Sequence, residues 1–190
     1  RSGCPRFKSG RGHFEQLFLH PLQLNHLSLR MHRVIVASAD IPSAHNDKED
    51  LMRVKFCGTA SLADMRCAID AGCDAVGFIM GVTHQSTDVV TPAEAAKMIR
   101  ELPPFIEPVA VTHLRDTEDL IGLVKDSRCT TLQIQDVVEP SGIPVIRYAL
   151  PYLKIVKAVH VTDESAIAAA KLYEPYADAL ILDTRTQEKI

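Results

Sequence analysis

From Arg53 onward, the sequence alternates between short apolar runs and amphipathic stretches that begin with helix-capping residues. The apolar runs are hydrophobic throughout rather than at every second position, which is typical of parallel strands buried beneath helices on a sheet. The expected strands are 53–57, 74–80, 106–112, 130–134, 153–159 and 177–183, and the expected helices are 61–71, 91–102, 116–125, 143–150 and 163–173. This order predicts an α/β fold.

The turn after the first expected strand distinguishes between two α/β architectures. A doubly wound sheet that binds a dinucleotide usually carries G-x-G-x-x-G at this point, whereas this chain has Cys57-Gly58-Thr59. We therefore expect a (β/α)₈ TIM-type barrel over residues 53–190. Six units would leave apolar strand edges exposed, so we expect a barrel truncated after about the sixth strand.

Residues 1–52 differ in kind from the rest of the chain. They hold five of the eight histidines and scattered arginines, without a sustained helical or strand period. Acidic residues such as Glu15 and Asp40 argue against an organelle-targeting leader. We expect an irregular N-terminal leader outside the fold, with Met52 as the natural start, rather than a functional module.

Composition excludes several classes of partner. The formal charge of −3 gives no basic field for nucleic acid, and no apolar run approaches the length that spans a bilayer. The five cysteines are irregularly spaced and form no C-x-x-C pair, which disfavours both a disulfide framework and a zinc ribbon. These features favour a cytoplasmic protein.

Two of the expected strands end in reactive side chains, Cys57 at the first strand and Asp183 at the last. Enzymes with parallel sheets keep their chemistry at the carboxyl ends of the strands. Because side chains alternate between the faces of a strand, Lys55 and Cys57 share one face, which points inward in a barrel. We expect Cys57 and Asp183 to face each other across the barrel mouth as an acid–base pair. Taken alone, Cys57 could be an inert buried thiol and Asp183 a helix cap.

Several segments, in this order and spacing, resemble phosphoribosylanthranilate isomerase, a (β/α)₈-barrel enzyme of tryptophan biosynthesis. They are Lys55-Phe56-Cys57-Gly58, 72–79, 101–105, Leu132-Gln133 and 180–184. The resemblance implies an Amadori rearrangement of N-(5-phosphoribosyl)anthranilate to 1-(2-carboxyphenylamino)-1-deoxyribulose 5-phosphate, without cofactor or metal. It also implies that Asp183 is the general acid that opens the sugar ring and that Cys57 is the general base that removes the C2 proton.

The loops at the expected mouth depart from the family pattern. Loop 81–90 lacks the arginine that contacts substrate in the family, and 132–136 keeps Gln133 but replaces a histidine and a glycine. The residues expected to bind substrate are Gln133, Gln135, His84 and His113. The family's phosphate site follows strands seven and eight, so we expect this chain alone to bind substrate poorly.

Three interpretations of the changed mouth remain open. The chain could bind the same substrate through other groups, or it could be a paralogous barrel that acts on, or merely binds, a different phosphorylated sugar. The third is a metal site, for which the candidate ligands are His84, Asp88, His113 and Asp136. Those four residues have no metal-ligand spacing, which disfavours the metal site. The first interpretation is preferred because Cys57 and Asp183 both remain. The oligomeric state is left open.

Overall fold

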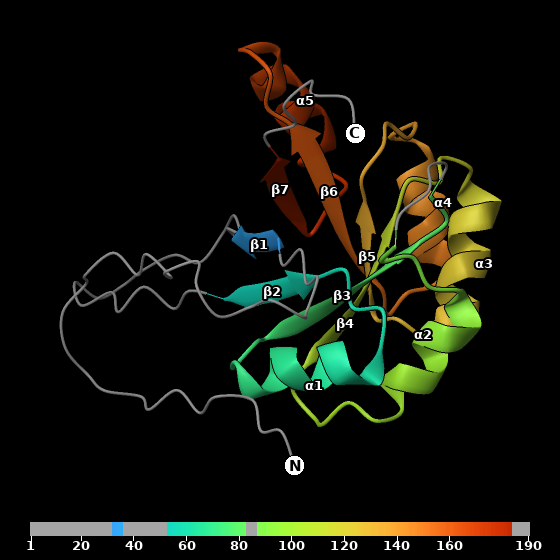
Figure 1. Ribbon diagram of the computed structural model, residues 1–190. Helices are drawn as coiled ribbons and strands as arrows, with labels where there is room; N and C mark the ends of the chain where they lie inside the picture. Colours follow the sequence, from blue (N-terminus) through green and yellow to red (C-terminus); the bar gives the residue numbers. More distant parts are fainter. Residues whose placement is uncertain (1–31, 36–52, 83–86, 184–190) are drawn as a thin grey trace, which may run out of the picture.

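The computed structural model describes residues 32–35, 53–82 and 87–183 (Figure 1). Strands and helices alternate in chain order after the first strand. The elements are β1 His32–Ile35, β2 Val54–Cys57, α1 Leu62–Asp70, β3 Ala75–Met80, α2 Pro92–Ile99, β4 Glu107–Thr112, α3 Thr117–Ser127, β5 Thr131–Ile134, α4 Gly142–Ala149, β6 Lys154–His160, α5 Ser165–Tyr173 and β7 Ala179–Asp183. Every expected strand and helix is therefore present, with boundaries shifted by a few residues at most.

All seven strands form one sheet, and their order in the sheet follows their order in the chain. Strands β2 to β7 are parallel to their neighbours, whereas β1 pairs antiparallel with β2. A doubly wound sheet would reverse its strand order at a switch point, and this sheet has none. It curls, with the helices along one face (Figure 1). The prediction of a partial (β/α)₈ TIM-type barrel is confirmed, with six of its strand units in the described chain.

The helices begin where the capping residues predicted. The side chains of Ser61, Thr91 and Asp116 each accept a hydrogen bond from a backbone N–H in the first turn, and Thr91 forms a reciprocal capping box with Glu94. Helix α2 ends at Ile99 rather than at 102. Its last residues tighten into turns, in which each N–H bonds to the carbonyl three residues earlier, before the chain reaches Pro103.

The apolar core lies between the sheet and the helices. It includes Val76, Phe78 and Leu132 from one face of the sheet, packed with residues such as Leu120 and Ile143 from the helices, all fully buried. Burial of each such side chain stabilises the fold by about 1.5–3 kcal/mol. The opposite, inner face of the sheet is more polar. Its buried residues include Lys55, Thr131 and Gln133.

Two aspartates set the register at the amino ends of the strands. Asp74 precedes β3 and accepts a 2.7 Å hydrogen bond from the N–H of Val54, while Asp178 precedes β7 and accepts a 2.7 Å bond from the N–H of Ile155. The Asp74 carboxylate thus fixes the start of β2, and the Asp178 carboxylate fixes the start of β6. The resulting pairing places Cys57 opposite Gly77.

Strand β1 lies within the segment expected to be an irregular leader. It runs along the edge of β2, with His32 as the register partner of Cys57. The rest of 1–52 lies outside the described residues, so the division at residue 52 stays a prediction. In the described part of the chain, no helix is long and apolar enough to cross a membrane.

Candidate active site

Cys57 and Lys55 lie together on the inner face of β2, beside Gly77 of β3. Cys57 is the last residue of its strand and is half-buried. A Cβ atom added to Gly77 would lie 3.1 Å from Cys57 Sγ and 3.1 Å from Lys55 Nζ, so sulfur and ammonium lie at most twice that distance apart. The absence of a side chain at Gly77 leaves the space in which both groups sit.

The Lys55 ammonium has no hydrogen-bond partner in the described structure. The residue is 4% exposed, and its Nζ is buried without a hydrogen-bond partner. Burying an ammonium group is costly unless an anion or hydrogen-bond acceptor compensates it. A thiolate is such an anion, and a nearby cation favours the thiolate form of a cysteine. The geometry of β2 and β3 therefore suits a reactive Cys57.

The turn after β2 holds Cys57 at the carboxyl end of the sheet. Gly58 has φ +86°, a conformation that favours glycine, and the N–H groups of Gly58 and Thr59 both donate to the carbonyl oxygen of Gly77, at 3.1 and 3.0 Å. A Cβ added to Gly58 would lie 3.5 Å from the side chain of Asp88. The turn is thus tied to β3 and approached by an acidic group from the next loop.

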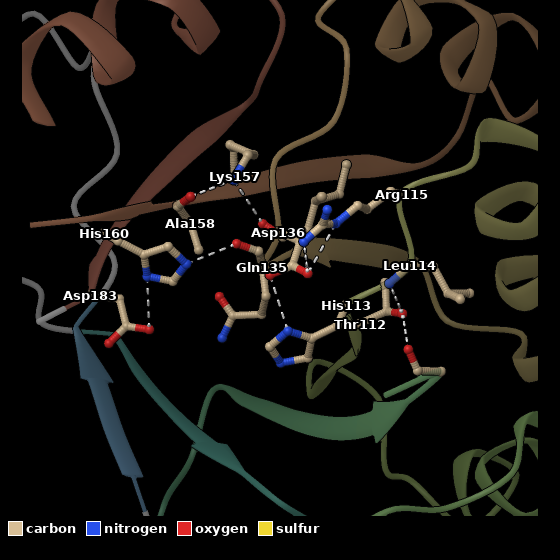
Figure 2. Close-up of polar contacts among 12 residues, drawn as sticks. Thr112, His113, Leu114, Arg115, Gln135, Asp136, Lys157, Ala158, His160 and Asp183 are labelled. Carbon is tan, nitrogen blue, oxygen red and sulfur yellow. Dashed lines mark hydrogen bonds and ion pairs between the residues drawn. The ribbon is translucent and has the colours of Figure 1, made fainter. Parts of the chain in front are cut away.

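Asp183 is the last residue of β7, where it faces His160 of β6. The two residues are register partners, and His160 Nδ1 lies 3.7 Å from Asp183 Oδ2. His160 Nε2 lies 3.1 Å from the carbonyl oxygen of Gln135, beyond the end of β5 (Figure 2). The backbone carbonyl of Asp183 accepts a 2.8 Å bond from Val161, which fixes the end of the strand. A carboxyl group and an imidazole therefore meet at the mouth.

A second imidazole–carboxylate pair lies at the ends of β4 and β5. His113 Nδ1 is 3.3 Å from Asp136 Oδ1, and the Arg115 guanidinium donates to Asp136 Oδ2 at 3.1 and 3.2 Å (Figure 2). Burial acts to raise the pKa of Asp136, but the hydrogen bonds from Arg115 and His113 outweigh it, so the pKa is lowered. Asp136 is thus held as a carboxylate, and it orients His113.

Five of the six sequence-predicted site residues lie in the described part of the chain. Cys57 and Asp183 end β2 and β7, at the same edge of the sheet, and their facing each other as an acid–base pair stays a prediction. Gln133 and Gln135 each have a buried Oε1 atom without a hydrogen-bond partner in the part of the chain that the structure describes, whereas His113 is bound to Asp136. His84 lies outside the described residues.

Sequence reasoning missed His160. The available signal was a histidine at the end of an apolar run, the same signal that pointed to Cys57 and Asp183.

The alternative metal site gains no support in the described ranges, where no group of three His, Cys, Asp or Glu residues could hold a metal ion. Instead, His113 and Asp136 bind each other and Arg115.

A hollow of about 170 Å³ lies against the inner face of the sheet, away from these strand ends. Residues at its wall include Arg53, Asp74 and Glu107 from the amino ends of the strands, together with Lys55 and Gln133. Cys57, His160 and Asp183 do not line it. Because barrel enzymes place their chemistry at the carboxyl ends of the strands, we assign the candidate site to the mouth rather than to this hollow.

Comparison with known proteins identifies similar sequences and structures. No protein-family model matches it. The chain is 39% identical over 133 residues to N-(5'-phosphoribosyl)anthranilate isomerase 2 of Methanosarcina mazei, covering 70% of this chain and 59% of the relative. It is 37% identical over 134 residues to the N-(5'-phosphoribosyl)anthranilate isomerase of Halorubrum lacusprofundi, covering 70% and 61%. The chain thus spans about three-fifths of the length of these curated relatives.

Solved structures give the same result. Phosphoribosylanthranilate isomerase from Thermotoga maritima superposes with a TM-score of 0.61 at 28% identity, covering 72% of this chain and 63% of that one. A phosphoribosylanthranilate isomerase in complex with reduced 1-(o-carboxyphenylamino)-1-deoxyribulose 5-phosphate gives 0.59 at 28% identity, covering 70% and 65%. By sequence and by fold, the chain is similar to the phosphoribosylanthranilate isomerases, of whose length it spans about three-fifths.

Proposed function

We propose that the protein to which this chain belongs isomerises N-(5-phosphoribosyl)anthranilate to 1-(2-carboxyphenylamino)-1-deoxyribulose 5-phosphate in tryptophan biosynthesis. The observation that carries the proposal is the placement of Cys57 at the end of β2, beside a Lys55 ammonium that has no hydrogen-bond partner among the described residues, in a chain similar to these isomerases. Asp183 at the end of β7 supplies the complementary acid.

The first step opens the ribose ring. Asp183 donates a proton to the ring oxygen, the bond from that oxygen to C1 breaks, and the nitrogen lone pair forms a C1=N iminium. Asp183 is suited to this step because it lies at the strand end, where a substrate in the mouth reaches it, and because it faces His160. The carboxyl group is left as a carboxylate.

The second step moves the double bond. The Cys57 thiolate removes the proton from C2, and the electron pair forms C1=C2 as the iminium nitrogen becomes neutral. Protonation of C1 and loss of the C2 hydroxyl proton then give the ketone. Lys55 contributes by stabilising the thiolate, since its ammonium is buried and otherwise uncompensated in the described structure.

Gln133 and Gln135 are proposed to bind the substrate through their buried amide oxygens, which can accept hydrogen bonds from sugar hydroxyl groups. His113, held by Asp136 beyond the end of β4, is proposed as a further substrate-binding residue, and His84 stays a candidate on sequence grounds alone. We place the reaction in the cytoplasm, a proposal supported by the five irregularly spaced cysteines, which form no C-x-x-C pair.

The test is steady-state turnover of the anthranilate substrate, followed by fluorescence, in the complete protein. Cys57→Ala and Asp183→Asn should each lower kcat by at least about 10²-fold, because each removes a group that transfers a proton in the reaction. Matched controls are Cys67→Ala on α1 and Asp126→Asn on α3, which change the same residue types away from the mouth. Unchanged turnover in either site variant would refute the assignment.

A further inference from the structure

The hydrogen bond between His160 and Gln135 determines which ring nitrogen of the histidine carries a proton. The partner of Nε2 is a backbone carbonyl oxygen, 3.1 Å away, which can only accept. Nε2 therefore carries a hydrogen in every protonation state that keeps this bond. In the neutral ring, Nδ1 is then a bare acceptor.

Nδ1 is the atom that faces Asp183. It is buried and has no hydrogen-bond partner within the described chain, and the Asp183 Oδ2 atom lies 3.7 Å from it. Two bare acceptors facing each other would repel. A single proton between them removes the repulsion, either as a carboxylic acid that donates to Nδ1 or as an imidazolium paired with a carboxylate.

The other charged groups drawn around His160 in Figure 2 are engaged with different partners. Asp136 accepts from Arg115 and His113, and Lys157 Nζ donates to the carbonyls of Ile134 and Ala158 (Figure 2). Of the groups drawn around His160, Gln135 offers the carbonyl that binds Nε2, and Asp183 offers the carboxylate that faces Nδ1. His160 is thus set to act on Asp183.

We propose that His160 and Asp183 share one proton, and that His160 is the positioning residue that keeps Asp183 supplied with the proton it gives to the ring oxygen. This inference rests on the proposed isomerase function. Asp183 donates the shared proton, the bond from C1 to the ring oxygen breaks, and the carboxylate that remains accepts the C2 hydroxyl proton as the ketone forms. Cys57 returns to C1 the proton it took from C2, so the pair ends each turnover as it began. The 3.7 Å separation shortens to a hydrogen bond when substrate binds, as is usual for catalytic pairs.

The first test uses ¹⁵N-histidine NMR on the chain itself. The His160 signals should show a protonated Nε2, and replacing Asp183 by Asn should shift the Nδ1 signal while leaving Nε2 protonated. A ring with its proton on Nδ1 and a bare Nε2 would overturn the inference, because that tautomer cannot donate to Gln135.

The second test uses substitutions in the complete protein to separate two features of His160, the donor at Nε2 that faces Gln135 and the acceptor at Nδ1 that faces Asp183. His160→Gln can keep a donor toward Gln135 but loses the acceptor that faces Asp183, so kcat should fall about tenfold or more with KM little changed. His160→Asn places an amide near the Nδ1 position and should recover part of kcat. The pH profile of kcat should shift in His160→Gln, which a merely structural role would not cause.

The outcomes distinguish the two proposals. No turnover in the unsubstituted complete protein would refute the isomerase assignment. Turnover in that protein, together with an unchanged kcat and pH profile in His160→Gln, would refute proton sharing while leaving the isomerase assignment intact.

Discussion

Gly77→Ala should impair the site without unfolding the protein. The new methyl group would lie 3.1 Å from both Cys57 Sγ and Lys55 Nζ, and 3.3 Å from the Cys57 Cα atom. Those distances are shorter than ordinary van der Waals contacts of a Cβ atom, so the side chains of Cys57 and Lys55 must move. The Lys55 chain is long and can turn away, whereas Cys57 is held by its own backbone and by the turn that follows it.

The expected magnitude follows from two opposing terms. Alanine in a strand interior is favoured over glycine by about 0.5–1 kcal/mol, and the displacement of two side-chain ends by a few tenths of an ångström offsets part or all of this. The free energy of unfolding should therefore change by less than about 1 kcal/mol. Activity is more sensitive to geometry, since a shift of about 1 Å can cost 10²-fold, so a smaller shift should lower kcat about tenfold.

Two assays follow the change. One is turnover of the complete protein, and the other is the rate at which iodoacetamide alkylates Cys57, read by peptide mass spectrometry, which needs no substrate. Alkylation should slow because separating Lys55 from the sulfur disfavours the thiolate. The matched control is Gly122→Ala in α3, where an added Cβ meets nothing within 4 Å, and which should stabilise the helix with no effect on either rate. Equal alkylation rates in Gly77→Ala and the unsubstituted chain would refute the link between Lys55 and Cys57.

Two further predictions concern the helix-facing side of the sheet. Burial lowers the pKa of Lys157 to about 8, although the charge of Asp136 acts to raise it. Between about pH 8 and pH 10.5, the unfolded chain therefore binds a proton at Lys157 that the folded chain does not. The free energy of unfolding should rise with pH across this range. Lys157→Met should lose this rise relative to the unsubstituted chain in urea denaturation, and identical pH slopes would show that Lys157 does not titrate in this way. Tyr173→Phe should lower the free energy of unfolding by about 1–2 kcal/mol, because the buried Val138 carbonyl loses its 2.8 Å hydrogen bond from the phenol; a thermal melt that matches the unsubstituted chain would contradict this.

Much of the fold was predictable because its signals are local. Ser61, Thr91 and Asp116 mark helix starts through side chains that bond to their own first turn, and the apolar runs mark strands buried under helices. One boundary shifted although the contact that sets it is also local. Helix α5 begins at Ser165 rather than at 163, because Asp163 accepts a 2.8 Å bond from the Ser165 N–H and so lies ahead of the helix.

The site was predictable only in part, since its contacts depend on the register between strands. Cys57 and Asp183 were recognisable as polar ends of apolar runs, and the family resemblance assigned their roles. Nothing in the local sequence pairs His160 with Asp183, because that contact follows from the alignment of β6 with β7. The proximity of Lys55 to Cys57 likewise depends on a glycine in the neighbouring strand.

The two halves of the proposed site are built from different parts of the sheet. Cys57, Lys55 and Gly77 belong to β2 and β3, whereas Asp183 and His160 belong to β7 and β6. Each half depends on pairing between adjacent strands, so the reactivity of Cys57 and the tautomer of His160 are local properties that can be measured separately. The proposed turnover has a further requirement, because β2 and β7 are the first and last of the parallel strands, and only the curl of the sheet would bring the proposed base and acid to the same sugar. A variant that preserves both local properties but loses turnover would therefore locate its defect in the closure of the barrel rather than in either catalytic group.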